Sequence, residues 1–392
     1  MEGGINMNHE MNHKAVVVGG SSGVGLALAK HLIAQNYEVC IVDRTEPQEG
    51  ALDPEGFTYR FCDLRFFDDA LFQELAADEK VNCLIITAGL GRVADLEYLH
   101  HAEIRNIMDI NANALMQIIR IFYQRISGRE DFFCGVMGSI AGLVSSPMFA
   151  AYAASKAAVC RFTESVNIEL EVKGSPNRIL NVSPGSIKGT GFNGGTTALE
   201  QLTGIAGEIC QHMMQRDTLW IPQYDEVFRG VIERYQNDAH AFGMQSYQYK
   251  QESGRCVQEE KVRIGYLSGT FDLFHVGHLN LLKRAKAQCD YLIVGVHPNA
   301  KHKNKETFIS LEERKQIVAA CRYVDKVVDS CTEDSDAWAL YHYNRLFVGS
   351  DYKGTERFLR YEEYFKDKGV EIVYFPYTQG TSSTQLRSAL VK

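Results

Sequence analysis

The chain has 392 residues, which predicts two or three domains at about 150 residues per domain. Apolar residues make up 45% and charged residues 23%, a globular composition that excludes collagen-like, disordered and coiled-coil proteins. The net charge of −8 argues against a general nucleic-acid-binding protein, although a local basic pocket for a small anion is still compatible with it.

The sequence also indicates where the protein acts. No apolar run reaches the ~18 residues that a membrane-spanning helix needs, so we expect no membrane partner. Residues 1–13 are polar and have no apolar core, so we interpret them as a flexible tail and not as a signal peptide. The ten cysteines include no C-x-x-C pair, which is typical of reduced thiols in a cytoplasmic protein.

The first predicted domain, residues 14–250, alternates β-runs with amphipathic helical patterns. We expect strands at 14–19, 38–43, 57–62, 82–87, 132–138 and 178–183, with helices such as 24–36 and 103–126 between them. This alternation is typical of βαβ units, which form a parallel sheet with helices on both faces.

A glycine-rich loop follows the first predicted strand and opens a helix. It contains Gly19, Ser21, Ser22, Gly23, Val24 and Gly25. Glycines let a backbone approach a pyrophosphate, although a purely structural strand–helix turn would look the same. Asp43 ends the next strand, 18 residues after Gly25, where a carboxylate can bind an adenosine ribose.

A second group of polar residues follows the fifth predicted strand. Ser139 ends that strand, and Tyr152 and Lys156 share one helix face at positions i and i+4. A phenol needs a neighbouring cation to act as an acid–base catalyst near neutral pH, and Lys156 is placed to lower the pKa of Tyr152. The alternative is an ordinary surface tyrosine and lysine.

Residues 14–250 resemble a classical short-chain dehydrogenase/reductase. The matching motifs are the loop Gly19, Gly23 and Gly25, Thr87-Ala88-Gly89, Asn111, the set Ser139, Tyr152 and Lys156, and Pro184-Gly185. The resemblance implies hydride transfer between a bound NAD or NADP and a carbonyl, with Tyr152 as the proton donor and Asn111 in a proton relay. It places Asp63, Leu64, Ala88 and Gly89 at the cofactor as well.

The sequence departs from the family pattern at two threonines, and it leaves the choice between NAD and NADP open. Thr87 replaces the family's Asn, and Thr190 comes slightly later than the threonine that usually follows Pro-Gly. Asp43 favours NAD, whereas Arg44 can pair with the 2′-phosphate of NADP, so the preference for NAD is weak. We expect residues 190–225 to form a lid over the substrate.

A polar stretch, residues 251–260, is the predicted linker to a second domain, residues 261–392. This domain repeats the alternation on a smaller scale, with strands near 262–267, 291–296, 326–329, 345–348 and 371–375 and helices near 277–287, 310–321 and 334–343. The predicted fold class is therefore α/β, with two doubly wound parallel-sheet domains in tandem.

The segment 269–278 follows the first predicted strand of the second domain and contains two histidines three residues apart. His275 and His278 are candidates for metal ligands, core residues or catalytic groups. A zinc site needs further ligands that the sequence does not offer, whereas imidazoles at a helix start suit a polyphosphate. Lys301, Lys303 and Lys305 follow the next strand, either as a solvated basic run or as a cap on the phosphates.

Residues 262–390 resemble cytidylyltransferases, most closely the glycerol-3-phosphate type. The resemblance implies that His275 and His278 contact the CTP phosphates, that Lys303 stabilises the transition state and that Mg²⁺ assists. It also assigns nucleotide binding to Gly269, Thr270, Phe271, Asp272, Gly277, Lys305, Arg314, Gly349, Asp351, Thr378, Thr381 and Ser382. Tyr377 and Gln379 replace a family Arg and Glu, and adenylyl transfer is the competing reaction.

Two such domains in one chain indicate consecutive reactions. A phosphorylated ketose such as ribulose 5-phosphate would be reduced to an alditol phosphate, which would react with CTP to give a CDP-alditol, such as CDP-ribitol, for a cell-surface polysaccharide. Alternatively, the transferase is of the CDP-glycerol type, and the reductase either acts on the CDP-linked product or is an inactive nucleotide sensor. Both families commonly self-associate, so we expect a homo-oligomer.

Overall fold

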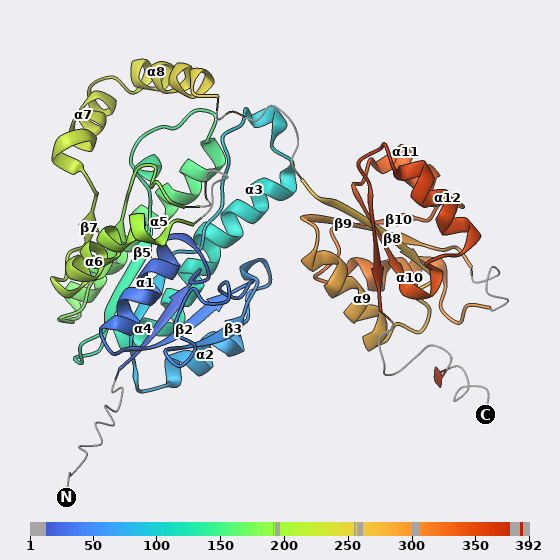
Figure 1. The fold of residues 1–392 in the computed structure, drawn as a ribbon, viewed down its shortest axis with the longest axis horizontal. Helices are drawn as coiled ribbons and strands as arrows, with labels where there is room; N and C mark the ends of the chain where they lie inside the picture. Colours follow the sequence, from blue (N-terminus) through green and yellow to red (C-terminus); the bar gives the residue numbers. More distant parts are fainter. Residues whose placement is uncertain are drawn as a thin grey trace, which may run out of the picture. The chain divides into compact units, whose positions relative to one another are not determined.

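The computed structural model describes residues 13–190, 192, 197–254, 256, 262–299, 306–376 and 385–386 (Figure 1). The chain divides into two compact units, Met1–Glu259 and Glu260–Lys392. Most of the predicted tail and linker lies outside the described residues. Within them, no helix has the length and apolar character needed to cross a lipid bilayer, and no disulfide is present.

The first unit is built on a seven-stranded parallel sheet with the order β3-β2-β1-β4-β5-β6-β7. The strands are β1 (Lys14–Val18), β2 (Glu38–Asp43), β3 (Phe57–Phe61), β4 (Val81–Ile86), β5 (Phe133–Met137), β6 (Ile179–Val182) and β7 (Leu219–Trp220). All six predicted strands are present. The prediction missed β7 because two residues are too few to show a period.

Helices cover both faces of this sheet. They are α1 (Gly23–Ala34), α2 (Asp69–Ala77), α3 (His101–Met108), α4 (Leu115–Ile126), α5 (Ala150–Val172), α6 (Leu199–Met214), α7 (Arg229–Asn237) and α8 (Ala239–Glu252). The side chains of α2, α4 and α5 fill the core on one face, and those of α1 and α6 fill it on the other.

Two predictions about these helices need correction. The expected single helix 103–126 is interrupted by a π-helical turn, Asp109–Ala114, between α3 and α4. The expected lid, residues 190–225, contains α6, which packs against α1 because its apolar stripe is buried in the core. Most of that stretch is therefore part of the scaffold.

The second unit is built on a five-stranded parallel sheet with the order β10-β9-β8-β11-β12. Its elements are β8 (Ile264–Gly269), α9 (Val276–Ala287), β9 (Tyr291–Val296), α10 (Leu311–Ala319), β10 (Lys326–Asp329), α11 (Asp334–Tyr341), β11 (Arg345–Gly349), α12 (Glu356–Phe365) and β12 (Glu371–Phe375). α9 and α10 pack on one face, and α11 and α12 on the other. The predicted fold class is thus confirmed, and α12 is the helix that the sequence analysis missed.

The strand order reverses between β1 and β4 in the first unit and between β8 and β11 in the second. In open parallel sheets, a crevice forms outside the carboxyl ends of the strands at such a reversal, because the helices that follow the two strands lie on opposite faces. The glycine-rich loop follows β1 and the His275 loop follows β8. Each predicted site therefore lies at the reversal point of its own sheet.

Candidate active sites

The glycine-rich loop joins β1 to α1. Gly19 and Gly23 have φ angles of +85° and +55°, a region that favours glycine. A Cβ on Gly25 would lie 2.2 Å from the Gly19 carbonyl oxygen and 2.5 Å from Thr87 Oγ1. Only glycine therefore lets α1 begin this close to the strand ends, where its N–H groups and dipole attract a pyrophosphate.

Three threonines surround this loop. Thr87, the replacement for the family's Asn, places its Oγ1 3.2 Å from the Val18 carbonyl and 3.1 Å from the Gly19 carbonyl, so it packs the end of β4 against the loop. Thr197 Oγ1 accepts a hydrogen bond from the Gly23 N–H at 3.0 Å, and Thr190 lies 3.8 Å from the position of a Cβ on Gly23. The late position of Thr190 thus still places it beside the loop.

Asp43 ends β2 and faces the same loop. Its Oδ2 accepts hydrogen bonds from the Ser21 hydroxyl at 2.6 Å and from the Ser21 N–H at 3.1 Å, and its Oδ1 accepts one from the Arg44 N–H at 2.7 Å. The Arg44 side chain is exposed. A carboxylate held in this place accepts hydrogen bonds from a ribose and repels a phosphate on the same sugar.

Replacing Asp43 with asparagine is expected to shift the relative use of the two dinucleotides towards NADPH. The change keeps the shape but removes the charge that repels a 2′-phosphate, so the ratio of kcat/KM for NADPH to that for NADH should rise about tenfold. Steady-state kinetics with both dinucleotides measure this ratio. Asp53→Asn, at an exposed position, is the matched control, and an unchanged ratio in Asp43→Asn would contradict the role.

Four further predicted cofactor residues, Asp63, Leu64, Ala88 and Gly89, follow β3 and β4. Asp63 forms a bidentate pair with Arg65 (Nε 3.0 Å, Nη2 2.6 Å); burial raises the pKa of this carboxyl, but the bonds to Arg65 outweigh it and lower the pKa overall. Leu64 packs against the core, and the Ala88 N–H donates to the Val18 carbonyl at 3.1 Å. The charge of Asp63 is thus already balanced by Arg65.

Ser139, Tyr152 and Lys156 come together at the carboxyl end of β5. Ser139 follows the strand, while Tyr152 and Lys156 lie one turn apart in α5, and none is more than 8% exposed. Lys156 Nζ lies 5.6 Å from the centre of the Tyr152 ring and donates a 2.7 Å hydrogen bond to the Met137 carbonyl.

Asn111 completes this group from the π-helical turn, a feature often found at functional sites. Its side-chain amide accepts from the Leu90 N–H and donates to the Leu90 carbonyl, both at 2.9 Å, and donates to Ser155 Oγ at 3.0 Å. A Cβ on Gly89 would lie 3.4 Å from both Asn111 Oδ1 and Lys156 Nζ. The structure therefore brings all four predicted groups together.

Burial shifts the acid–base behaviour of this group. It raises the pKa of Tyr152 to about 12, although the bond with Ser139 lowers it, and it lowers the pKa of Lys156 to about 8. The sequence predicts a lowered pKa for the Tyr152 phenol. That prediction is wrong here, because desolvation outweighs the effect of neighbouring groups on this pKa. Tyr152 is therefore protonated at neutral pH and available as an acid.

Replacing Lys156 with methionine is expected to stabilise the first unit at pH 7. With a pKa of about 8 in the folded state and 10.5 as the ordinary value, the buried ammonium costs up to about 3 kcal/mol below pH 8. Between pH 8 and 10.5 the folded protein binds fewer protons than the unfolded chain, so the cost disappears with rising pH. Urea unfolding at several pH values measures the difference.

The control for this prediction is Lys173→Met, at the exposed end of the same helix, which should change the stability little at any pH. A gap between Lys156→Met and the wild type that widens from pH 8 to 10.5 would contradict the assigned pKa direction.

Aromatic side chains surround Tyr152, and the sequence analysis missed them. The Phe149 ring stacks on Tyr152 with centroids 4.1 Å apart, and Phe192 lies 5.4 Å away. From α8, Lys250 Nζ donates to the Ser146 hydroxyl at 2.7 Å and to the next carbonyl at 2.8 Å, which secures the loop before Phe149. These loop residues follow no periodic pattern that would predict their place. The one feature of the sequence that could have indicated an aromatic ring beside Tyr152 is the position of Phe149, three residues earlier.

Pro184 and Gly185 follow β6 beside this group. The Pro184 carbonyl accepts a 3.0 Å hydrogen bond from the Ile140 N–H and a 3.5 Å bond from the Ser139 hydroxyl. A Cβ on Gly185 would lie 2.3 Å from the ring of Phe228. Phe228, from the π-helical turn before α7, therefore covers the Pro184-Gly185 turn that matches the family's motif.

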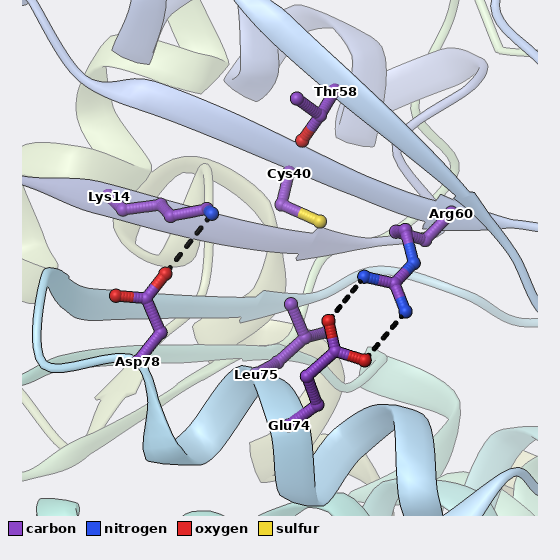
Figure 2. A pocket seen from close by; sticks show the side chains of 7 residues that line it. All are labelled: Lys14, Cys40, Thr58, Arg60, Glu74, Leu75 and Asp78. Atoms are coloured by element: carbon purple, nitrogen blue, oxygen red, sulfur yellow. Dashed lines mark hydrogen bonds and ion pairs between the residues drawn. The ribbon is translucent and has the colours of Figure 1, made fainter.

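A hollow of about 380 Å³ lies elsewhere in the first unit, between the sheet and α2 (Figure 2). It is lined by Lys14, Cys40, Thr58, Arg60, Glu74, Leu75 and Asp78. Lys14 pairs with Asp78 at 3.1 Å, and Arg60 pairs with Glu74 at 2.7 Å. The hollow contains none of the predicted site residues, and its cations are matched by carboxylates.

In the second unit, His275 and His278 lie at the start of α9 with ring centres 4.1 Å apart. His275 Nδ1 accepts from the Gly277 N–H at 3.0 Å, and His278 Nδ1 accepts from the His275 N–H at 3.3 Å. These bonds assign the proton of each neutral ring to Nε2. Burial lowers the pKa of His275, which favours the neutral form, so both rings present Nε2–H donors that suit phosphate oxygens.

The loop before these histidines is held rigidly. The buried Asp272 carboxylate accepts from the Phe308 N–H at 3.1 Å and from the Ile309 N–H at 3.0 Å. Phe271 has a φ of +52°, and its ring is buried in the core. Thr270 Oγ1 is buried and has no hydrogen-bond partner among the described residues. A buried hydroxyl without a partner is costly, which fits a loop that receives a ligand atom.

Arg314 differs from its predicted role at the phosphates. Its side chain is fully buried and donates to four carbonyls, those of Thr270 (2.5 Å), His297 (2.8 Å), Pro298 (3.0 Å) and Ile309 (2.9 Å). Burial accordingly lowers its pKa. Arg314 is therefore a positioning residue that ties the nucleotide loop to the segments after β9 and before α10.

Only some of the other predicted nucleotide-binding residues lie in the part of the chain that the structure describes. Gly349 ends β11, and a Cβ there would lie 2.4 Å from Asp351 Oδ1, so glycine is needed beside that carboxylate. The predictions for Lys301, Lys303, Lys305, Tyr377, Thr378, Gln379, Thr381 and Ser382 lie outside the described residues. The described part contains no group of three or more His, Cys, Asp or Glu residues that could hold a metal ion.

The two groups of site residues define an α/β protein with an oxidoreductase site in one unit and a nucleotidyltransferase site in the other. The short chain dehydrogenase family matches residues 13–200, and the cytidylyltransferase-like family matches residues 266–389. The chain belongs to the cytidylyltransferase family through its second unit, and its first unit is a short-chain dehydrogenase/reductase domain.

Individual relatives agree with this assignment. Glycerol-3-phosphate cytidylyltransferase of Bacillus subtilis is 37% identical over 126 residues, which is 31% of this chain and 92% of the relative. Ethanolamine-phosphate cytidylyltransferase of Dictyostelium discoideum is 51% identical over 70 residues, 17% of this chain and 19% of the relative. A short-chain dehydrogenase/reductase of Burkholderia phymatum in complex with NAD shares the fold of the first unit, at 20% identity and a TM-score of 0.50, over 58% of this chain and 94% of the other.

Proposed function

We propose that the chain is a bifunctional enzyme that makes a CDP-alditol in the cytoplasm. It reduces a phosphorylated ketose, such as ribulose 5-phosphate, to an alditol phosphate and then couples that phosphate to CMP, giving a product such as CDP-ribitol. The observation that carries the proposal is the presence, in one chain, of a complete acid–base group around Tyr152 and a complete imidazole pair at a nucleotide loop.

In the first unit, the reduced nicotinamide supplies a hydride to the carbonyl carbon when NAD(P)H is bound. The Ser139 hydroxyl orients the carbonyl oxygen, and Tyr152 donates a proton to it, so that the C=O bond becomes a CH–OH group. A proton from solvent then returns to the phenolate through Lys156, with Asn111 positioning the relay. The carboxylate of Asp43 favours NADH over NADPH.

In the second unit, an oxygen of the alditol phosphate attacks the α-phosphorus of CTP in line, and the bond to the β-phosphate breaks to release pyrophosphate. His275 and His278 donate Nε2–H groups to the phosphate oxygens on which charge accumulates. Asp272 and Arg314 keep their loop in position. We propose that Mg²⁺ enters with the triphosphate and neutralises part of its charge.

A single panel of assays tests the proposal against its alternatives. The full-length protein is incubated with ketose phosphates and NADH or NADPH, and CTP is then added while pyrophosphate is measured. We expect dinucleotide oxidation without CTP, followed by pyrophosphate release. Reduction that requires CTP would indicate that the CDP-linked product is reduced, and an absence of oxidation with every ketose phosphate would indicate a sensor domain.

A further inference from the structure

A buried carboxylate lies beside the carboxyl end of β8 in the second unit and makes few hydrogen bonds with the described residues. Asp334, the first residue of α11, is 8% exposed. Its Oδ1 accepts one long hydrogen bond from the Ser268 hydroxyl at 3.4 Å, and its Oδ2 lies 3.8 Å from an Arg357 nitrogen. A buried carboxylate normally accepts several short hydrogen bonds, because the loss of water must be offset.

The backbone around this carboxylate is well anchored, in contrast to its side chain. The Asp334 N–H donates to the Tyr361 hydroxyl at 2.9 Å, and its carbonyl accepts from the Tyr343 hydroxyl at 2.7 Å. Both tyrosines are at most 4% exposed. Tyr361 also donates to Glu333 and accepts from Arg357 Nε at 3.0 Å. This network fixes the position of Asp334 but leaves acceptor positions on its carboxylate, an arrangement suited to a ligand.

The location connects this carboxylate to the nucleotide site. Ser268 is the residue before Gly269 at the end of β8, the strand at the reversal point of the sheet. Thr270, with its unpartnered hydroxyl, follows directly. Ser268 and Asp334 therefore lie at the strand end from which the His275 loop departs. The nucleotide loop and this carboxylate thus share one edge of the sheet.

We propose that Asp334, with Ser268 and Arg357, forms the subsite that binds the hydroxyl groups of the acceptor alditol phosphate. This inference rests on the proposed function and deepens it. A hydroxyl can donate to the carboxylate and at the same time accept from the guanidinium or from Ser268. Neighbouring hydroxyls of a polyol therefore suit a site in which a hydrogen-bond acceptor lies beside hydrogen-bond donors.

The same geometry selects against an amine. The related ethanolamine-phosphate cytidylyltransferase is named for an acceptor that carries an ammonium group. An ammonium bound to Asp334 would lie beside the Arg357 guanidinium, which is 3.8 Å from that carboxylate and 3.5 Å from Glu333. Two cations that share one carboxylate repel each other in a partly buried site, whereas a hydroxyl carries no charge.

The test compares Asp334→Asn with Asp336→Asn, an exposed position two residues along the same helix. Pyrophosphate release by the full-length protein is measured with ribitol 5-phosphate, glycerol 3-phosphate and ethanolamine phosphate as acceptors. For Asp334→Asn we expect the KM for the alditol phosphates to rise about tenfold, with the KM for CTP changed by about twofold at most. Asp336→Asn should behave as the wild type.

A second variant gives an independent signature if Asp334→Asn proves unstable. Arg357→Met should also raise the KM for alditol phosphates, and it should increase the kcat/KM for ethanolamine phosphate because the repelling cation is gone. An unchanged KM for alditol phosphates in these variants, or an equal rise in the KM for CTP, would overturn the subsite alone. A wild type that uses no alditol phosphate would overturn the proposed function and the subsite together.

Discussion

Tyr152→Phe is expected to abolish reduction of the ketose phosphate while cytidylyl transfer continues. The variant loses the proton donor but keeps the ring that stacks on Phe149, so the fold of the site is retained. Loss of a positioned general acid slows such a reaction by about 10³-fold, or about 4 kcal/mol of activation free energy. Dinucleotide oxidation measures the loss, and pyrophosphate release from added alditol phosphate measures the second activity.

Two comparisons make this result specific. Binding of NADH, followed by its fluorescence, should stay close to that of the wild type because the glycine loop and Asp43 are untouched. Tyr123→Phe, which removes a hydroxyl 3.5 Å from Glu169 on the surface of α4, should keep full reductase activity. Substantial reduction by Tyr152→Phe would rule out the proposed proton donor.

His278→Asn should show the converse pattern, with cytidylyl transfer lost and reduction retained. The asparagine can still accept the hydrogen bond from the His275 N–H, but it cannot place a donor where Nε2–H lies. Removing one preorganised donor from a charge-stabilising site costs about 10²-fold or more in kcat. The rate of pyrophosphate release with a saturating alditol phosphate measures this loss.

The matched control is His342→Asn, at the exposed C-terminal end of α11, where a left-handed backbone accepts asparagine. It should leave transfer unchanged. If His278→Asn were to keep wild-type transfer, or to lose reduction as well, the imidazole pair could not have the role assigned to it.

The strands and the two nucleotide loops were predictable from the sequence because buried parallel strands are continuous apolar runs and the loops carry glycines at fixed spacing. Ser139, Tyr152, Lys156 and Asn111 were predictable as a group, since each occupies a motif position after a predicted strand or on a predicted helix. Packing on both faces of each sheet then brought them together.

What the sequence did not reveal depends on tertiary burial. Arg314 was predicted to bind the nucleotide, and its complete burial follows from three loops folding over it. The raised pKa of Tyr152 has the same origin, because the residue is buried in the folded protein and one ring beside it, Phe192, comes from a distant loop. Asp334 belongs to no motif, and its sparse hydrogen bonding is visible only once the neighbours of α11 are in place.

The burial of Arg314 has a consequence for how the transferase site is assembled. One planar group with a fixed fork of donors holds the carbonyls of segments that are far apart in the sequence, from Thr270 to Ile309. These segments should consequently acquire protection from amide hydrogen exchange together and lose it together. The nucleotide loop thus becomes rigid together with the segments after β9 and before α10, as one cooperative unit, before any nucleotide binds.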